Sequence, residues 1–408
     1  MPLPRRSNSM TDQKKPGGRA DYPDKPVILT FIGNYLPGYK AGGILRITVN
    51  TVDHLCDEFE FKIVTTDRDL GDDKPYPDVK LNQWQQVGNA QVYYLSSQSN
   101  TLKDIYNLII NTPHDMLYLN SFFDALTIKV LLNRKLRKMN FKPVIVAPWG
   151  EFGWASLKQK YPKKFVFIQL ARLAGLYDNV TWRAASEFEM ADIVKVMKIK
   201  STNIHVTEDL PIKNISQDVS LNQSASDSLR IVFLSRISRE KNLDYALMIL
   251  KKVVAKVIFD IYGPAENTVY WDECRELIRH LPANVTVHYL GRVDSNEVVK
   301  IFSRYDLFLF PTGGEAYGHV IAECLIAGTP VLLSTETPWR NLKDDGLGWD
   351  IDLTQIDSFV EVIEDLALLN HDERLKQRSK IKTRIVERLL DPKILEENHR
   401  LFKKQLPH

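Results

Sequence analysis

The sequence predicts an α/β protein with two doubly wound, Rossmann-like domains that face each other across a cleft. Three observations lead to this fold class. The chain has 408 residues, of which 44% are hydrophobic, and single cores stop growing near roughly 250–300 residues, so two domains are expected. Short apolar runs bounded by turn residues alternate with helical patterns, which is typical of βαβ units around a parallel sheet. A polar stretch over Asn214–Ser228 interrupts this alternation, which then restarts.

The expected strands are short apolar runs that end at turn residues. In the first half they are Val27–Ile32, Phe61–Thr65, Val92–Leu95, Met116–Leu119, Val144–Ala147 and Ile204–Val206. In the second half they are Ile231–Leu234, Val257–Tyr262, Val285–Tyr289, Leu307–Phe310 and Pro330–Leu333. The chain therefore divides into a disordered tail over 1–25, a first domain over 26–213, a linker over 214–228, a second domain over 229–385 and a C-terminal helix over 386–408.

Composition excludes several classes of protein. The formal net charge of +3 is too small over this length to indicate nucleic acid as the main partner. Cys56, Cys274 and Cys324 are odd in number and far apart, which fits neither a disulfide framework nor a CxxC zinc site and favours a reducing cytosol. The N-terminal tail has no apolar core of a secretory signal, and no run of about 18 apolar residues predicts a transmembrane helix.

The segment FPTGGEAYGHVIAECLIAGTPVLLS, residues 310–334, carries the most chemistry. A buried strand is followed by a glycine-containing loop and by a helix that we expect to begin near Ala316 and to be capped by Gly328. The backbone amides of Ala316–His319 are then expected at a helix N-terminus, where they form a cradle for phosphate or polyol oxygens. Glu315 and Glu323 are separated by a helical rise of roughly 12 Å, so they suit two ends of one elongated ligand better than the paired carboxylates of a hydrolase.

Two further loops are expected at the same cleft. In LSRISREKNL, residues 234–243, Arg236 and Lys241 follow a strand and precede a helix, so they would neutralise a leaving diphosphate without a metal. A solvated charged loop is the alternative. In GNYLPGYKAGG, residues 33–43, Gly42 and Gly43 let the backbone approach a ligand closely. The latter loop is not GxGxxG, which counts against a dinucleotide-binding dehydrogenase.

The segment with Glu315 and Glu323 resembles the donor-binding signature of retaining glycosyltransferase family 4, with its Glu-x7-Glu pattern in a GT-B fold. The resemblance covers residues 27–390 and implies that the C-terminal helices return toward the N-terminal, acceptor-side domain. It makes Glu315, Arg236 and Lys241 the catalytic residues. The implied donor-binding residues are Gly42, Gly43, Asn120, Ser121, Gly263, Gly291, Gly314, Ala316, Tyr317, Gly318, His319 and Glu323. By the same resemblance, Glu315 contacts the donor sugar and Glu323 the ribose hydroxyls.

The sequence also departs from the family pattern. Many relatives carry a histidine after the strand that corresponds to Met116–Leu119, whereas this chain offers Asn120 and Ser121, which would hydrogen-bond a sugar hydroxyl. For the glycines at 263 and 291, a simple tight turn is an equally good interpretation. Asp67 and Asp69 imitate the DxD metal motif of the other glycosyltransferase fold, GT-A, and we interpret this match as a coincidence.

A basic segment lies outside the donor motifs. From residue 156 to 172 the chain has five cations and no acid, and we expect Lys158, Lys160, Lys163 and Lys164 to contact anionic lipid or a lipid diphosphate. Phe165, Phe167 and Ile168 are expected to dip into the membrane interface beside them. A solvated helix face is the alternative.

The resemblance implies a retaining hexosyltransferase that moves a sugar from a UDP- or GDP-sugar to a hydroxyl of a saccharide or lipid-linked acceptor. Surface polysaccharide or lipopolysaccharide biosynthesis in the cytoplasm, at the inner face of the cytoplasmic membrane, is the expected setting. No metal, cofactor or nucleic-acid partner is expected. Two alternatives stay open: another GT-B enzyme, such as a nucleotide-sugar epimerase or a phosphorylase, and a non-catalytic partner subunit with the same fold.

Overall fold

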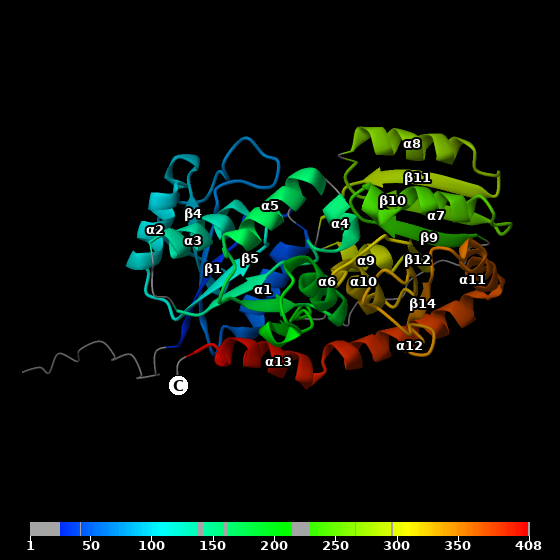
Figure 1. Ribbon diagram of the computed structural model, residues 1–408. Helices are drawn as coiled ribbons and strands as arrows, with labels where there is room; N and C mark the ends of the chain where they lie inside the picture. The colour runs from blue at the N-terminus through cyan, green and yellow to red at the C-terminus, as the bar shows by residue number, and fades with distance from the viewer. Residues whose placement is uncertain are drawn as a thin grey trace, which may run out of the picture.

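The computed structural model describes residues 25–40, 42–137, 142–158, 161–213, 228–265, 267–294 and 297–406. It has two lobes, each built around a parallel sheet with helices on both faces (Figure 1). The tail expected over 1–25 lies outside the described residues except for Lys25, and the linker expected over 214–228 lies outside them except for Ser228.

The N-terminal domain contains an eight-stranded sheet with the order β3-β4-β2-β1-β5-β6-β7-β8. Its strands are β1 (Val27–Phe31), β2 (Glu60–Thr66), β3 (Trp84–Val87), β4 (Ala90–Leu95), β5 (Met116–Asn120), β6 (Val144–Ala147), β7 (Thr181–Ala184) and β8 (Ile204–Val206). All pairs are parallel except β3 with β4. The helices are α1 (Gly43–Leu55), α2 (Leu102–Asn111), α3 (Ala125–Leu136), α4 (Trp154–Lys158), α5 (Tyr161–Leu173) and α6 (Glu187–Met197).

The C-terminal domain contains a parallel six-stranded sheet with the order β11-β10-β9-β12-β13-β14. Its strands are β9 (Leu229–Leu234), β10 (Val257–Tyr262), β11 (Val285–Gly291), β12 (Leu307–Phe310), β13 (Val331–Ser334) and β14 (Gly348–Ile351). The helices are α7 (Leu243–Leu250), α8 (Thr268–Arg279), α9 (Val298–Phe302), α10 (His319–Ile326) and α11 (Ile356–Leu368). The central strands are buried on both faces, which explains their continuous apolar runs.

The chain then returns to the N-terminal domain through α12 (His371–Leu389) and α13 (Pro392–Lys403), which run beneath both lobes (Figure 1). Asn370 and Glu373 form a capping box that starts α12, and Asp391 caps α13 ahead of Pro392. Phe402 packs against aromatic rings of the N-terminal core, including Phe61 and Tyr118. The return of the C-terminal helices is as expected, but the segment over 386–408 comprises the end of one helix, α12, and the whole of a second, α13.

Every expected strand is present within two residues of its expected ends. The sequence missed β3, β7 and β14, which are four-residue strands with polar or charged side chains among the apolar ones. The helix expected near Ala316 begins instead at His319, because Gly318 adopts φ 83 and serves as its N-cap. The amides of Ala316 and Tyr317 therefore lie in the loop before α10, and the expected helical cradle is displaced by about one turn.

Candidate functional site: the cleft between the domains

The two charged motifs of the C-terminal domain come together after β9 and β12. Nζ of Lys241 lies 2.6 Å from Oε1 of Glu315, and the two side chains are only 12% and 17% exposed. The backbone N–H of Gly313 donates to the carbonyl of Glu240 at 2.7 Å, and the Thr312 hydroxyl donates to the same oxygen at 3.0 Å. The carboxyl ends of neighbouring parallel strands thus hold a cation and a carboxylate at one point of the cleft edge.

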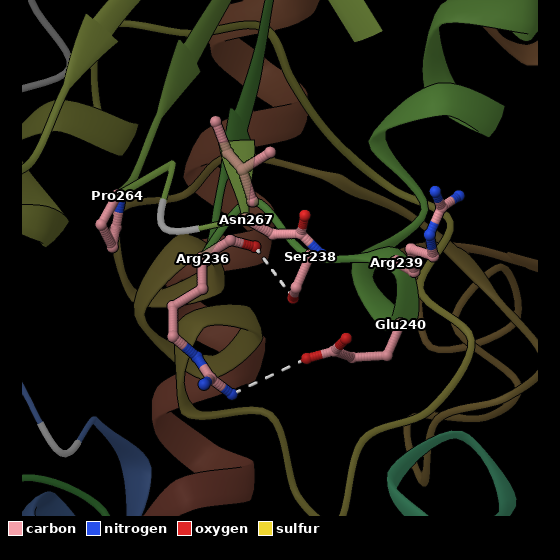
Figure 2. Close-up of a pocket in the computed structure, with 7 residues that line it drawn as sticks. Arg236, Ser238, Arg239, Glu240, Pro264 and Asn267 are labelled. Atoms are coloured by element: carbon pink, nitrogen blue, oxygen red, sulfur yellow. Dashed lines mark hydrogen bonds and ion pairs between the residues drawn. The ribbon is translucent and has the colours of Figure 1, made fainter. Parts of the chain in front are cut away.

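Arg236 lies on the other side of the same loop. Its side chain is 56% exposed, and Nη2 lies 3.9 Å from Oε1 of Glu240. Arg236 lines a hollow of about 290 Å³, and Figure 2 shows its side chain among the other lining residues. The hollow is lined by Arg236, Ile237, Ser238, Arg239, Glu240, Pro264 and Asn267. Arg239 pairs with Glu273 at 2.6 Å, away from Arg236, so Arg236 is the cation of this loop with the freest approach to a ligand.

Gly263, which directly precedes Pro264 of this hollow, is tightly packed. A Cβ at Gly263 would lie 1.8 Å from the carbonyl oxygen of Ser235, and its φ of 133 also excludes other residues. The Gly263 N–H donates to the carbonyl of Gly291 at 2.7 Å. The turn interpretation therefore accounts for Gly263, whereas Gly291, with φ 72, faces open space.

Glycines of the N-terminal domain approach the loop that carries Glu315. Gly42 caps α1 with φ 67, and a Cβ at Gly43 would lie 3.8 Å from the ring of His319. Gly150 has φ 76, and its Cβ would collide with Cβ of Ala316 at 2.7 Å. The glycine-rich loop after β1 and the loop before α10 therefore face each other across the boundary between the two domains.

An ion pair between Arg46 and Glu323 also crosses the cleft. Both side chains are largely buried, at 25% and 18% exposed. Arg46 lies one turn beyond Gly43 on α1, and Glu323 lies one turn beyond His319 on α10, so the first turns of the two helices face each other. The sequence did not indicate Arg46 as a site residue, because it belongs to the site only through its ion pair with Glu323 of the other domain.

A second cross-domain contact involves buried charges that the sequence did not single out. Nε2 of His319 lies 3.2 Å from Oδ2 of Asp209, which is fully buried. The guanidinium of Arg183 donates to Asp209 at 2.5 Å and lies over the ring of Trp149 at 4.2 Å. Burial by itself would raise the pKa of Asp209, but Arg183 and His319 hold that pKa below its usual range. A network of charges inside the N-terminal domain therefore holds the first residue of α10.

Asn120 and Ser121, the residues expected in place of the family's histidine, already have partners within the protein. The Asn120 amide donates to the carbonyl of Phe31 at 3.2 Å and accepts from the indole N–H of Trp149 at 3.0 Å. The Ser121 hydroxyl donates to Glu151 at 2.6 Å. Both residues thus shape the loop after β5, and sugar contact by either would require an exchange of partners.

Glu151 organises the same loop from the end of β6. Its carboxylate accepts hydrogen bonds from Ser121 and from the backbone N–H groups of Phe122 and Phe123. Burial outweighs these hydrogen bonds and raises the pKa of Glu151 to about 7. The folded protein therefore holds a proton on Glu151 that the unfolded chain releases near pH 4.5.

This raised pKa predicts the direction of a pH effect on stability. Between pH 5 and pH 7 the folded state binds more protons at Glu151 than the unfolded state, so stability falls as pH rises, by about 2 kcal/mol. Glu151→Gln lacks this proton and should show a shallower decline. Urea denaturation of both proteins at several pH values measures how the free energy of unfolding depends on pH. If this dependence is the same in both proteins, the raised pKa of Glu151 is not its cause.

Asp67 and Asp69 hold loops together. Asp69 accepts from the backbone N–H groups of Tyr39 and Lys40 at 2.8 and 3.1 Å, and Asp67 pairs with Arg68 at 2.8 Å. Both aspartates are buried. Across the part of the chain that the structure describes, no three His, Cys, Asp or Glu side chains gather as metal ligands would. These contacts support the interpretation of the DxD match as a coincidence.

The structure of the basic segment, residues 156–172, differs in part from what the sequence predicts. Lys158 and Lys163 are exposed, Lys160 lies outside the described residues, and Lys164 turns inward to donate to the carbonyl of Ser156 at 2.7 Å. Phe165 is exposed as expected. The expectation that Phe167 and Ile168 dip into a membrane is wrong, because Ile168 is buried in the core of the N-terminal domain and the partly buried Phe167 packs against that core.

Comparisons with known proteins place this fold in a class. Anabaena HepE in complex with UDP and glucose superposes with a TM-score of 0.62 at 12% identity, over 93% of this chain and 99% of that one. A glycosyltransferase from Rickettsia africae gives 0.66 at 16% identity, over 93% and 98%. WaaG, a glycosyltransferase involved in lipopolysaccharide biosynthesis, gives 0.62 at 14% identity, over 92% and 99%. At these identities the likeness establishes the fold, which is GT-B.

Comparisons of sequence support the same class of protein as the fold. Residues 217–384 match the family described as glycosyl transferases group 1. An uncharacterized 41.2 kDa protein in the cps region of Klebsiella pneumoniae is 25% identical over 278 residues, which are 65% of this chain and 74% of the relative. An uncharacterized glycosyltransferase of Methanocaldococcus jannaschii is 29% identical over 115 residues, which are 27% of this chain and 28% of the relative. Together the matched domain and the fold support a GT-B glycosyltransferase.

Proposed function

We propose that the protein is a retaining glycosyltransferase of the family 4 type, which moves a sugar from a UDP- or GDP-sugar to a hydroxyl of a saccharide or lipid-linked acceptor. The observation that carries the proposal is the 2.6 Å contact between Lys241 and Glu315. A nucleotide sugar presents a hydroxylated ring next to a diphosphate, and this pair offers a carboxylate next to a cation. The cps-region relative supports a role in surface polysaccharide biosynthesis.

Each charged residue has a role in the proposal. Glu315 accepts hydrogen bonds from sugar hydroxyls, while Lys241 and Arg236 neutralise the diphosphate as it leaves. Glu323 first breaks its ion pair with Arg46 and then binds the ribose hydroxyls. Backbone amides around Gly314 and His319 bind the remaining oxygens, with Gly42 and Gly43 on the opposite wall.

The proposed reaction retains the configuration at the anomeric carbon. The bond from this carbon to the diphosphate oxygen breaks, and the acceptor oxygen attacks from the same face. The acceptor proton passes to the departing diphosphate oxygen, so the protein supplies no base. In this scheme two cations and the surrounding amides stabilise the leaving group.

Nucleotide affinity tests the two cations. Arg236→Ala and Lys241→Ala should each weaken binding of the nucleoside diphosphate by about 10- to 100-fold, because each removes one charge-assisted contact. Titration calorimetry with UDP and GDP measures the change, and Arg275→Ala, on the exposed face of α8, is the matched control. A variant that unfolds at lower temperature yet binds as well as wild type would assign its residue a structural role.

Metal removal tests the leaving-group chemistry. Activity should survive EDTA within about twofold, because cations and amides take the place of a divalent ion at the diphosphate. Rates before and after dialysis against the chelator, with and without added Mn²⁺, give the answer. A strict Mn²⁺ requirement would restore Asp67 and Asp69 as candidate ligands.

Nucleotide release from a panel of nucleotide sugars, with and without acceptors, tests the function as a whole. Acceptor-dependent release supports a transferase. An altered sugar nucleotide formed without acceptor indicates an epimerase, and sugar phosphate formed from inorganic phosphate indicates a phosphorylase. Failure to bind any nucleotide indicates a non-catalytic subunit.

The proposal also has a cellular setting. We place the enzyme in the cytoplasm, at the inner face of the cytoplasmic membrane, where lipid-linked acceptors are elongated. Among the described residues, no helix combines the length and the apolarity that crossing a bilayer requires. We propose that contact with the membrane is peripheral, and Lys158 and Lys163 are exposed lysines of the basic segment that are available for it.

A further inference from the structure

Helices α4 and α5 lie on the surface of the N-terminal domain, with α4 near the boundary with the C-terminal domain (Figure 1). They present an apolar face outward. Its exposed side chains are Trp154, Tyr161, Phe165, Val166, Leu170 and Leu173. Trp154 is 69% exposed and Leu173 is 85% exposed. We call these six residues the α4–α5 face.

The α4–α5 face consists of a row of aromatic side chains and a neighbouring row of aliphatic ones. The rings of Trp154 and Tyr161 lie 6.1 Å apart, and those of Tyr161 and Phe165 stack at 5.7 Å. Val166, Leu170 and Leu173 extend the face along α5 at helical spacing. Three rings and three aliphatic side chains are thus exposed together on two neighbouring helices, whereas apolar residues scattered singly over a surface would need no explanation.

The fold of the domain does not require this patch. The other side of α5 already packs inward through Phe167, Ile168 and Ala171. A helix on the surface of a globular domain ordinarily shows polar residues on its outer side, whereas α5 is apolar on both. The outer apolar side therefore fits a partner outside the domain.

Charge indicates which partner. From Phe152 to Tyr177 the chain contains no Asp or Glu, and Lys158 and Lys163 are exposed beside the α4–α5 face. In a symmetric contact with a second copy, these lysines would face the same cationic surface, which is unfavourable. A bilayer with anionic lipid offers phosphates to the lysines and an apolar interior to the six side chains.

We propose that the α4–α5 face is a membrane-docking element that inserts its aromatic and aliphatic side chains into the interface of an anionic bilayer. This deepens the proposed function, because it commits the acceptor to a lipid-linked class that approaches from the N-terminal domain. It also differs from docking by lysines alone. Electrostatic docking disappears at high salt, whereas insertion leaves a component of binding that resists salt.

Cosedimentation of the full chain with vesicles tests docking without donor or acceptor. The vesicles contain phosphatidylcholine alone or an equimolar mixture with phosphatidylglycerol. The test variant replaces Trp154, Phe165 and Leu170 by Gln. The matched control replaces Val254, Val269 and Leu368 by Gln, since these residues of the other domain are 81%, 66% and 84% exposed.

Wild type and the control should bind the anionic vesicles and retain part of this binding in 0.5 M salt, which is a test concentration of about three times physiological ionic strength. The test variant should bind about tenfold less at either salt concentration. A second variant, Lys158→Gln with Lys163→Gln, should lose binding mainly at low salt. Circular dichroism checks that each variant is folded.

Equal binding by wild type and the test variant would overturn the proposal, as would no binding by wild type. Light scattering tests the alternative partner, a second copy of the chain. If wild type is a dimer and the test variant is a monomer, the α4–α5 face is a contact between copies. The vesicle assay involves no sugar transfer, so its failure leaves nucleotide release unaffected. Conversely, a protein that docks but never releases nucleotide would overturn only the proposed function.

Discussion

Glu315→Gln should reduce sugar transfer by about 100- to 1,000-fold while leaving most of the affinity for the nucleoside diphosphate. The substitution keeps the size of the side chain but removes the charge that faces Lys241 at 2.6 Å. A sugar contact that strengthens in the transition state is worth a few kcal/mol in such a site, whereas the diphosphate keeps both of its cations. Nucleotide release measures turnover, and calorimetry with UDP or GDP measures affinity.

The control for this prediction is Glu361→Gln, which makes the same chemical change on the exposed face of α11. It should behave as wild type in both measurements. Turnover of Glu315→Gln within about threefold of wild type would remove Glu315 from its proposed role. A parallel loss of turnover and of diphosphate affinity would instead make it part of the diphosphate site.

Arg183→Ala should lower the free energy of unfolding by about 3–5 kcal/mol. Arg183 is 2% exposed and pairs with Asp209, which is completely buried. Removal of the guanidinium leaves this carboxylate without its cation inside the N-terminal domain. Breaking a buried pair in this way costs far more than the pair contributes relative to apolar residues. Denaturation followed by circular dichroism measures the effect.

Two further variants separate charge from packing. Arg279→Ala removes an exposed arginine of α8 that pairs with Glu276 on the protein surface, and it should change stability by less than about 1 kcal/mol. Arg183→Met combined with Asp209→Leu replaces both charges by apolar side chains and should recover much of the lost stability. If the double variant is as unstable as Arg183→Ala, the buried charge is not the cause.

The C-terminal domain was the more predictable half, for a physical reason. Its donor motifs lie on loops directly after β9 and β12, and the strand order of a doubly wound sheet places these two strands side by side, which brings Lys241 close to Glu315. In the N-terminal domain, β7 was missed because Arg183 interrupts a short apolar run. Nothing local marks that arginine as buried, since its partner Asp209 lies 26 positions further along the chain.

The cross-domain contacts were the least predictable part of the site. In the sequence, Arg46 looks like any other cation on a helix. Only the fold shows that Glu323 lies opposite it. Asn120 and Ser121 were correctly located at the end of β5, but their hydrogen bonds to Phe31 and Glu151 depend on strands and loops distant in sequence. Contacts of this kind arise from packing between elements, which neither periodicity nor motif spacing encodes.

The return of the chain through α12 and α13 limits how the two lobes can move. The chain passes between lobes twice, once between β8 and β9 and once between α12 and α13. Both passages begin or end near α13, because Asn398 donates to the carbonyl of Glu208 at 2.8 Å. Two connections so close together leave the lobes little freedom to slide or twist relative to each other. The main motion is then a rotation about the edge that carries α13. Opening would therefore be widest at the far rim, and release of product would follow a hinge motion with one dominant axis.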